Sequence, residues 1–204
     1  MNRVLLTALC LILAQISLSS CEEVVEVPPV EEKVPLQVGN EWVYELSYYD
    51  TLGNVLNTSY QRKTVLNDTI IQNDTWFVMN DGQLVRNSSD GYVYYNLAGR
   101  QPVIIYPSAS HGQIGYRYEY PHYSLWVLTT PREQASTLNT SLGELSCSLF
   151  TISNEYLSPH DTAPRVRKQE DYVSPGIGLV RTNTYYIDSN KLQERRELIS
   201  YTLR

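Results

Sequence analysis

The chain has 204 residues, about the length of one domain. Hydrophobic residues make up 42% and charged residues 19% of it, and this balance excludes a disordered or highly charged protein. The formal net charge of −6 disfavours a nucleic-acid partner, because binding to phosphates needs a basic surface. We therefore expect one folded body that does not bind nucleic acid.

Residues 1–20 have the organisation of a secretory leader. Arg3 gives a positive start, and a mostly apolar run follows from Val4 to Leu18. That run is shorter than the roughly 20 apolar residues of a membrane-spanning helix. The leader ends in Leu18-Ser19-Ser20-Cys21, which resembles a bacterial lipobox. The resemblance implies that residues 1–20 are removed and that Cys21 receives a diacylglyceryl thioether and an acylated amine, with palmitate among the acyl chains. An ordinary signal peptide followed by a chance Cys is the alternative.

The segment that follows Cys21 predicts a tether. Five Glu and three Pro lie in residues 22–35, and a like-charged, Pro-rich chain stays extended and solvated. We assign residues 21–35 to the lipidated Cys and its acidic spacer, and residues 36–204 to a single domain. The acidic residues also resemble the export tags of surface-displayed lipoproteins in some Gram-negative bacteria. Both the periplasmic and the surface face of an outer membrane are open on this evidence.

The domain reads as a series of strands. Trp42, Tyr44 and Leu46 alternate with more polar residues, which places them on one face of a sheet. Turn residues, such as Asn67-Asp68 and Asn80-Asp81-Gly82, recur at a spacing of roughly 8–12 residues. The 17 Tyr favour β structure, and no long helical period occurs beyond the leader. We predict an all-β domain, an antiparallel meander forming one strongly curved sheet, a half-barrel or a barrel.

Three segments of the domain share a familiar layout. Residues 35–44 read PLQVGNEWVY, residues 174–180 read SPGIGLV and residues 197–201 read ELISY. Together they resemble a broad group of uncharacterised bacterial envelope lipoproteins with the layout PLxVGNxWxY … PGxGxV … ELxxY. The segment from Gly143 to Cys147 is similar to that group's Gly-x-x-x-Cys strand. The resemblance implies a secreted, β-rich body and carries no established activity.

No pattern of catalytic or metal-binding residues is apparent, so we predict no catalytic residue, metal or cofactor. The three His are far apart and lack the spacing of a zinc site. Cys147, which is left over after leader removal and lipidation, lies in an alternating strand pattern and is expected to be a small buried hydrophobe. A pair of carboxylates for glycoside hydrolysis stays open, with Glu119 and Glu144 as candidate members.

An aromatic stripe is the best candidate for binding. Tyr116, Tyr118 and Tyr120 fall on one face of a strand, and Tyr123 and Trp126 follow closely. Such rings can stack on sugars or contact a protein partner. Half-buried sheet packing, with the Tyr hydroxyls in water, is the alternative.

These observations favour a lipid-anchored lipoprotein of the Gram-negative cell envelope, with a non-enzymatic domain that is structural or binds a glycan, an amphiphile or a protein. One alternative is a carrier or envelope assembly factor that holds a lipid tail in a half-barrel cavity. The other is a carboxylate-dependent hydrolase. An apolar cavity would favour the carrier, and two acids facing each other in a cleft would favour the hydrolase.

The lipid anchor gives a direct prediction. In cells fed a clickable fatty acid, the wild-type chain should become labelled and Cys21→Ser should not, because the serine hydroxyl cannot form the thioether. Equal labelling of the two proteins would contradict lipidation at Cys21.

Overall fold

The computed structural model describes residues 32–132 and 135–204. The predicted leader, Cys21 and most of the predicted tether lie outside these residues. Every regular element in the described part is a β-strand, and all strand pairs are antiparallel, which confirms the predicted all-β class. A search of the described residues for a helix long and apolar enough to cross a membrane finds none.

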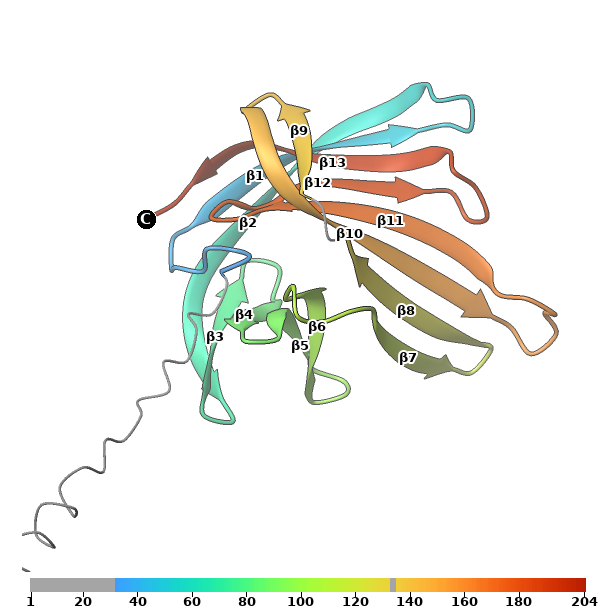
Figure 1. The fold of residues 1–204 in the computed structure, drawn as a ribbon, viewed down its shortest axis with the longest axis horizontal. Helices are drawn as coiled ribbons and strands as arrows, with labels where there is room; N and C mark the ends of the chain where they lie inside the picture. Colours follow the sequence, from blue (N-terminus) through green and yellow to red (C-terminus); the bar gives the residue numbers. More distant parts are fainter. Residues whose placement is uncertain (1–31, 133–134) are drawn as a thin grey trace, which may run out of the picture.

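Thirteen strands follow one another along the chain (Figure 1). They are β1 (Glu41–Tyr49), β2 (Val55–Ile71), β3 (Asp74–Met79), β4 (Leu84–Ser88), β5 (Gly91–Asn96), β6 (Gln101–Pro107), β7 (Ile114–Tyr120), β8 (Tyr123–Pro131), β9 (Ser136–Thr140), β10 (Gly143–Leu157), β11 (Arg165–Ser174), β12 (Gly178–Tyr185) and β13 (Leu192–Thr202).

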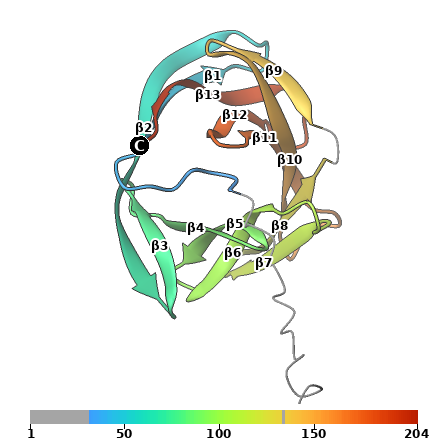
Figure 2. The ribbon, with the colours of Figure 1, turned by 60° about the vertical axis from the view of Figure 1, so that its left-hand side comes forward.

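The strands form one curved sheet that almost closes on itself. Its order is β6-β5-β4-β3-β2-β1-β13-β12-β11-β10-β8-β7, with β9 paired to β10 beside this path. Two meanders therefore meet where β1 pairs with β13. Figure 2 shows the resulting ring, in which the two terminal strands of the sheet, β6 and β7, come to the same side. The predicted meander and strong curvature are confirmed.

The core begins on the inner face of β1. Trp42, Tyr44 and Leu46 are buried, as their alternation predicts, and they pack in one cluster with Val65 and Leu198. Burying large apolar side chains of this kind contributes about 1.5–3 kcal/mol each. The inner faces of β1, β2 and β13 therefore contribute to one apolar core.

The layout of three segments noted in the sequence has a structural basis, since the fold brings the segments together. The Trp42 indole donates a hydrogen bond to the Ile177 carbonyl at 2.6 Å, and the Tyr44 hydroxyl donates to the Leu179 carbonyl at 3.1 Å. In the third segment, Leu198 is fully buried and pairs with Tyr44. These residues tie β1 to β13, to the start of β12 and to the turn before it, which gives the shared layout a packing role.

The packed part of the chain begins before residue 36, where the domain was predicted to start. Lys33 and Val34 are buried, and the segment from residue 32 to residue 40 crosses the interior of the ring (Figure 2). The Asn87 side chain donates to the Val34 carbonyl at 2.8 Å. Lys33 places its ammonium 5.9 Å from the centre of the Phe150 ring. Residues 33–35 thus belong to the folded body, because the Val34 side chain packs into the apolar core inside the barrel.

One predicted turn is wrong and another is confirmed. Strand β2 runs through Asn67 and Asp68, just after its pairing with β3 shifts register between Val65 and Asn67, and the chain turns later at Gln72 and Asn73. Both turn residues have positive φ, 54° and 68°, the conformation that a tight two-residue hairpin requires. The Asn80-Asp81-Gly82 hairpin lies where it was predicted, between β3 and β4.

Gly91 provides a test of the packing between β5 and β6. Its φ is +131°, and a Cβ at this position would lie 2.1 Å from the Tyr106 carbonyl oxygen. Gly91→Ala should lower the free energy of unfolding by about 3 kcal/mol or more, since backbone strain and overpacking add.

The matched control is Gly82→Ala. Gly82 also has positive φ, +82°, but no atom lies within 4 Å of the position that an alanine methyl group would take, so only the conformational cost of about 1–2 kcal/mol applies. Chemical denaturation measures both variants. Equal losses for the two would show that the close approach to Tyr106 is unimportant.

Candidate functional site

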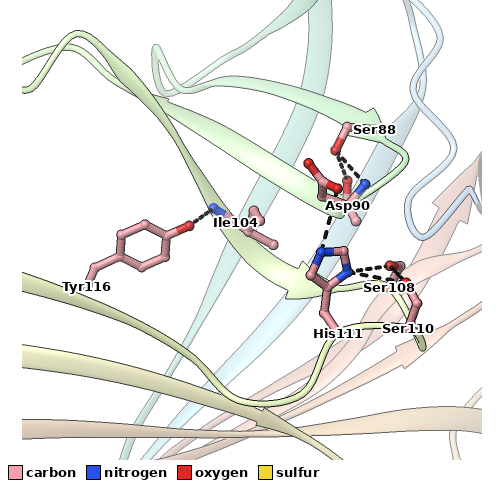
Figure 3. A network of polar contacts seen from close by, with 8 residues as sticks. Ser88, Asp90, Ile104, Ser108, Ser110, His111 and Tyr116 are labelled. Carbon is pink, nitrogen blue, oxygen red and sulfur yellow. Dashed lines mark hydrogen bonds and ion pairs between the residues drawn. The ribbon is translucent and has the colours of Figure 1, made fainter.

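The two terminal strands of the sheet face each other across a seam, which we define as the space between β6 and β7. The sheet order contains no β6–β7 pair among the described residues. Two tyrosine contacts span this space instead, one between β7 and β6, which Figure 3 shows, and one between β7 and the neighbouring strand β5. The backbone N–H of Ile104 donates to the Tyr116 hydroxyl at 2.8 Å, and the Tyr94 and Tyr118 hydroxyls lie 3.2 Å apart. Each such bond contributes about 1 kcal/mol, so the seam is held less firmly than a paired strand.

A cavity of about 720 Å³ lies along this seam, and we call it the seam cavity. Its walls come from β5, β6, β7, β8 and β10. Aromatic and aliphatic side chains predominate, and they include Tyr94, Tyr116, Tyr118, Tyr120, Val103, Ile105, Leu125, Val127 and Ile152. The volume is in the range of small-molecule sites, which are usually apolar with a few polar groups.

Three of the five aromatic residues predicted for binding line this cavity. Tyr116, Tyr118 and Tyr120 alternate along β7. Tyr116 pairs with Val127 and Tyr118 pairs with Leu125 on β8, so aliphatic residues surround the rings on the same face. The tyrosines are therefore neither simple surface groups nor fully packed core, because Tyr116 and Tyr118 are half-buried at the edge of a hollow.

The other two predicted residues lie elsewhere. Tyr123 stacks on Tyr120 at the tip of the β7–β8 hairpin, with ring centres 4.7 Å apart. Trp126 pairs with Arg117, whose guanidinium lies 5.2 Å from the indole ring, and both alternate away from the tyrosines of the cavity. The stripe expected from the sequence is thus divided between the seam cavity, the hairpin tip and the opposite face of the sheet.

The hydroxyl groups of the seam can both donate and accept hydrogen bonds. Burial raises the pKa of Tyr118 above its ordinary value, and the hydrogen bond with Tyr94 raises it further. Tyr118 therefore keeps its proton at neutral pH. Arg117 and Glu119 also border the cavity. They form an ion pair with each other on the exposed side of β7. The cavity consequently offers an apolar interior with a small number of uncharged hydroxyls.

A buried carboxyl group lies on the inner face of the barrel, and sequence patterns gave no indication of it. Asp171 of β11 accepts a hydrogen bond from the Tyr106 hydroxyl at 3.0 Å and two from the Gln169 amide at 3.0 Å each. Burial raises the pKa of Asp171, while hydrogen bonds from Thr182, Gln169 and Tyr106 oppose the rise. A single acid in a run of polar strand residues looks like a surface group until the partner strands are known.

A Ser–His–Asp group joins the linker between β6 and β7 to the β4–β5 turn (Figure 3). The Ser108 hydroxyl is 2.9 Å from His111 Nδ1, and His111 Nε2 is 3.6 Å from an Asp90 carboxyl oxygen. The last distance is too long for a hydrogen bond, and Ser108 is buried. Because the Ser108 N–H also donates to the Asp90 carbonyl at 2.8 Å, the group fastens the linker to the β4–β5 turn.

The carboxylates considered for hydrolysis are separated. Glu144 lies at the start of β10, whereas Glu119 pairs with Ser124, which in turn pairs with Leu157 at the end of β10. Cys147 is buried beside Leu138 and Val180, as predicted. Within residues 32–132 and 135–204, no group of three or more His, Cys, Asp or Glu side chains is placed to hold a metal ion.

Comparisons with known proteins give distant structural similarity and no family. No protein-family model and no curated protein matches the chain. A crystal structure of a protein assigned as a lipoprotein of Parabacteroides distasonis ATCC 8503 is 15% identical, with a TM-score of 0.47, and the match covers 83% of this chain and 98% of that one. A protein assigned as exported, with a YmcC-like fold, from Bacteroides fragilis NCTC 9343 is 13% identical, with a TM-score of 0.48 and the same coverage. Similarities this distant transfer no property to this chain.

Asp171 gives a prediction about pH dependence. Its folded-state pKa is raised, so the folded protein binds more protons than the unfolded one between the ordinary value of 3.8 and the raised value. Stability from this group is therefore present at low pH and is lost as the pH rises through that window. Asp171→Asn removes the loss, so the variant should gain stability relative to the wild type as the pH rises to neutrality.

Asp188→Asn is the control of opposite sign. Its carboxyl accepts hydrogen bonds from the Val166 N–H and the Arg165 side chain, which hold the pKa of Asp188 below its usual value. This variant should lose stability relative to the wild type above the ordinary pKa. Urea unfolding between about pH 3 and pH 8 measures both, and parallel pH curves for Asp171→Asn and the wild type would contradict the assignment.

Proposed function

We propose that the protein is a lipoprotein of the Gram-negative cell envelope, held at the outer membrane by a lipid on Cys21, and that its barrel binds an amphiphile in the seam cavity. The observation that carries the binding proposal is the cavity itself. It is about 720 Å³ in volume and is lined mainly by apolar side chains, with tyrosine hydroxyls at its edge.

The chemistry of the walls favours a molecule with an apolar body and a small polar part. Val103, Leu125 and Val127 offer surfaces that gain free energy by excluding water, about 25 cal/mol for each Å² of apolar area buried. The hydroxyls of Tyr94 and Tyr118 can pair with a polar group at one end. A lipid tail or a compact amphiphile meets both requirements.

The anchor supports the same function. Acyl chains on Cys21 would hold the barrel near a membrane, at a distance set by the acidic spacer. Amphiphiles are concentrated at such a surface. Tethering therefore raises the local concentration of the proposed ligand around the barrel, as for any linked binding partner.

A glycan is a second candidate ligand, and a different observation favours it. Tyr120 and Tyr123 stack at an exposed hairpin tip, with a hollow of about 190 Å³ beside them. Exposed aromatic rings can stack on sugars. The hollow at the tip is much smaller than the seam cavity of about 720 Å³, so we place it second.

The proposal is tested by measuring the binding of a fluorescent, nitrobenzoxadiazole-labelled dodecanoic acid to the full chain carrying Cys21→Ser, with unlabelled palmitate as competitor. Val127→Asp should weaken binding at least tenfold, because it places an unpaired charge in an apolar wall. Thr130→Asp is the matched control, since Thr130 is exposed three residues along the same strand.

A second variant guards against misfolding of Val127→Asp. Ala98 is exposed at the rim of the cavity, so Ala98→Trp should obstruct the cavity without placing a charge in the core. Circular dichroism confirms that each variant is folded. If the protein without these substitutions fails to bind the labelled acid, the seam cavity is not the binding site. The same conclusion follows if Val127→Asp and Ala98→Trp bind the acid as tightly as the control Thr130→Asp.

A further inference from the structure

The seam divides the barrel into a firmly paired part and a hairpin attached on one side. Strand β7 pairs with β8, and β8 pairs with β10, so the β7–β8 hairpin is joined to the sheet through β8. On its other side, β7 meets β6 through the Tyr116 hydroxyl and β5 through the Tyr118 hydroxyl. In the described part of the chain, no ladder of backbone hydrogen bonds would have to break for β7 to part from β6.

One end of the seam is fastened and can act as a hinge. The linker of residues 108–113 joins β6 to β7 there. Ser108 donates its N–H to Asp90 at 2.8 Å, and the His111 N–H donates to the Ser108 carbonyl at 3.0 Å. Ser108 and His111 are also joined through their side chains at 2.9 Å. The hairpin is therefore constrained at this end by the polar group shown in Figure 3.

The other end of the seam lies next to the cavity. Asn96 and Ala98, at the β5–β6 turn, and Tyr120, at the β7–β8 turn, all border the seam cavity. Tyr118 reaches across to Tyr94, and the pKa of Tyr118 also reflects a hydrogen bond with Asn96. The contacts that span the seam beside the cavity are thus side-chain hydroxyl and amide groups, which exchange with water at small cost.

From this arrangement we infer that the seam is the entrance of the cavity, and that the hydroxyls of Tyr116 and Tyr118 are the latches that close it. Strand β7 bends away from β6 while β8 stays paired with β10, with the linker of residues 108–113 as its fixed end, so that the amphiphile enters sideways and the seam closes behind it. This inference rests on the proposed function. It assigns to Tyr116 and Tyr118 a control of the rates of binding, in addition to any contact that they make with the ligand.

Removing a latch shifts β7 toward the open state and has a distinct kinetic signature. In stopped-flow fluorescence with the labelled dodecanoic acid, Tyr116→Phe and Tyr118→Phe should each raise the association and the dissociation rate together, by about fivefold for one lost hydrogen bond. Tyr201→Phe is the matched control, because Tyr201 is an exposed tyrosine of β13 outside the cavity.

A covalent lock provides the converse test. Tyr94 and Tyr118 meet at their hydroxyls, so in a chain carrying Cys10→Ser and Cys21→Ser the double variant Tyr94→Cys, Tyr118→Cys can be joined, after loading with ligand, by a bifunctional maleimide whose spacer replaces the two phenol rings. Cys147 is buried, and burial raises the pKa of its thiol, so it competes poorly for the reagent. The joined protein should release the labelled acid at least tenfold more slowly than each single-Cys variant treated in the same way.

The outcomes separate the two proposals. If the wild type does not bind the labelled acid, the proposed function fails, and the entrance with it. If the wild type binds but the Phe variants change the dissociation rate alone, the hydroxyls are ligand contacts and the entrance is overturned. Release from the joined protein at the rate of the single-Cys variants would overturn the entrance as well.

Discussion

The structure depends on how the two edge strands of one thirteen-stranded sheet, β6 and β7, satisfy their free backbone groups. An edge strand exposes backbone donors and acceptors, and a barrel usually removes its edges by pairing the first strand with the last. Here β6 and β7 meet without such pairing, and the phenol of Tyr116 supplies the acceptor for the Ile104 N–H. A tyrosine side chain is much longer than a backbone hydrogen bond. Because a tyrosine side chain takes the place of a backbone carbonyl, β6 and β7 are held apart, and the seam cavity occupies the space between them.

The opposite wall is built for rigidity. Trp42 and Tyr44 of β1 are buried and also hydrogen-bonded to the carbonyls of Ile177 and Leu179, so apolar burial and polar pairing act on the same side chains. Val34 packs against this wall from inside the ring. The contrast between a wall fixed in this way and a strand, β7, whose free side is held by hydroxyls is the physical basis for placing binding and movement at the seam.

Much of the fold could be predicted from local patterns, since strand periodicity and turn chemistry are local properties. The alternation of Trp42, Tyr44 and Leu46 and the turn at Gly82 required no knowledge of other strands. The site depends on pairings that local patterns do not contain. Tyr116 and Trp126 look equivalent in the sequence, yet the register of β7 against β8 puts them on opposite faces. The burial of Asp171 likewise results from Tyr106, which comes from a strand 65 residues away along the chain.

The most direct test of ligand binding in the seam cavity is photo-crosslinking with a fatty acid that carries a diazirine on its alkyl chain, followed by peptide mapping of the full chain. We predict that the label attaches to peptides containing β6, β7 and β8, above all at Val103, Leu125 and Val127, and that excess palmitate prevents it. Labelling confined to outward-facing residues such as Thr130, or labelling that palmitate does not reduce, would contradict a ligand site in the seam cavity.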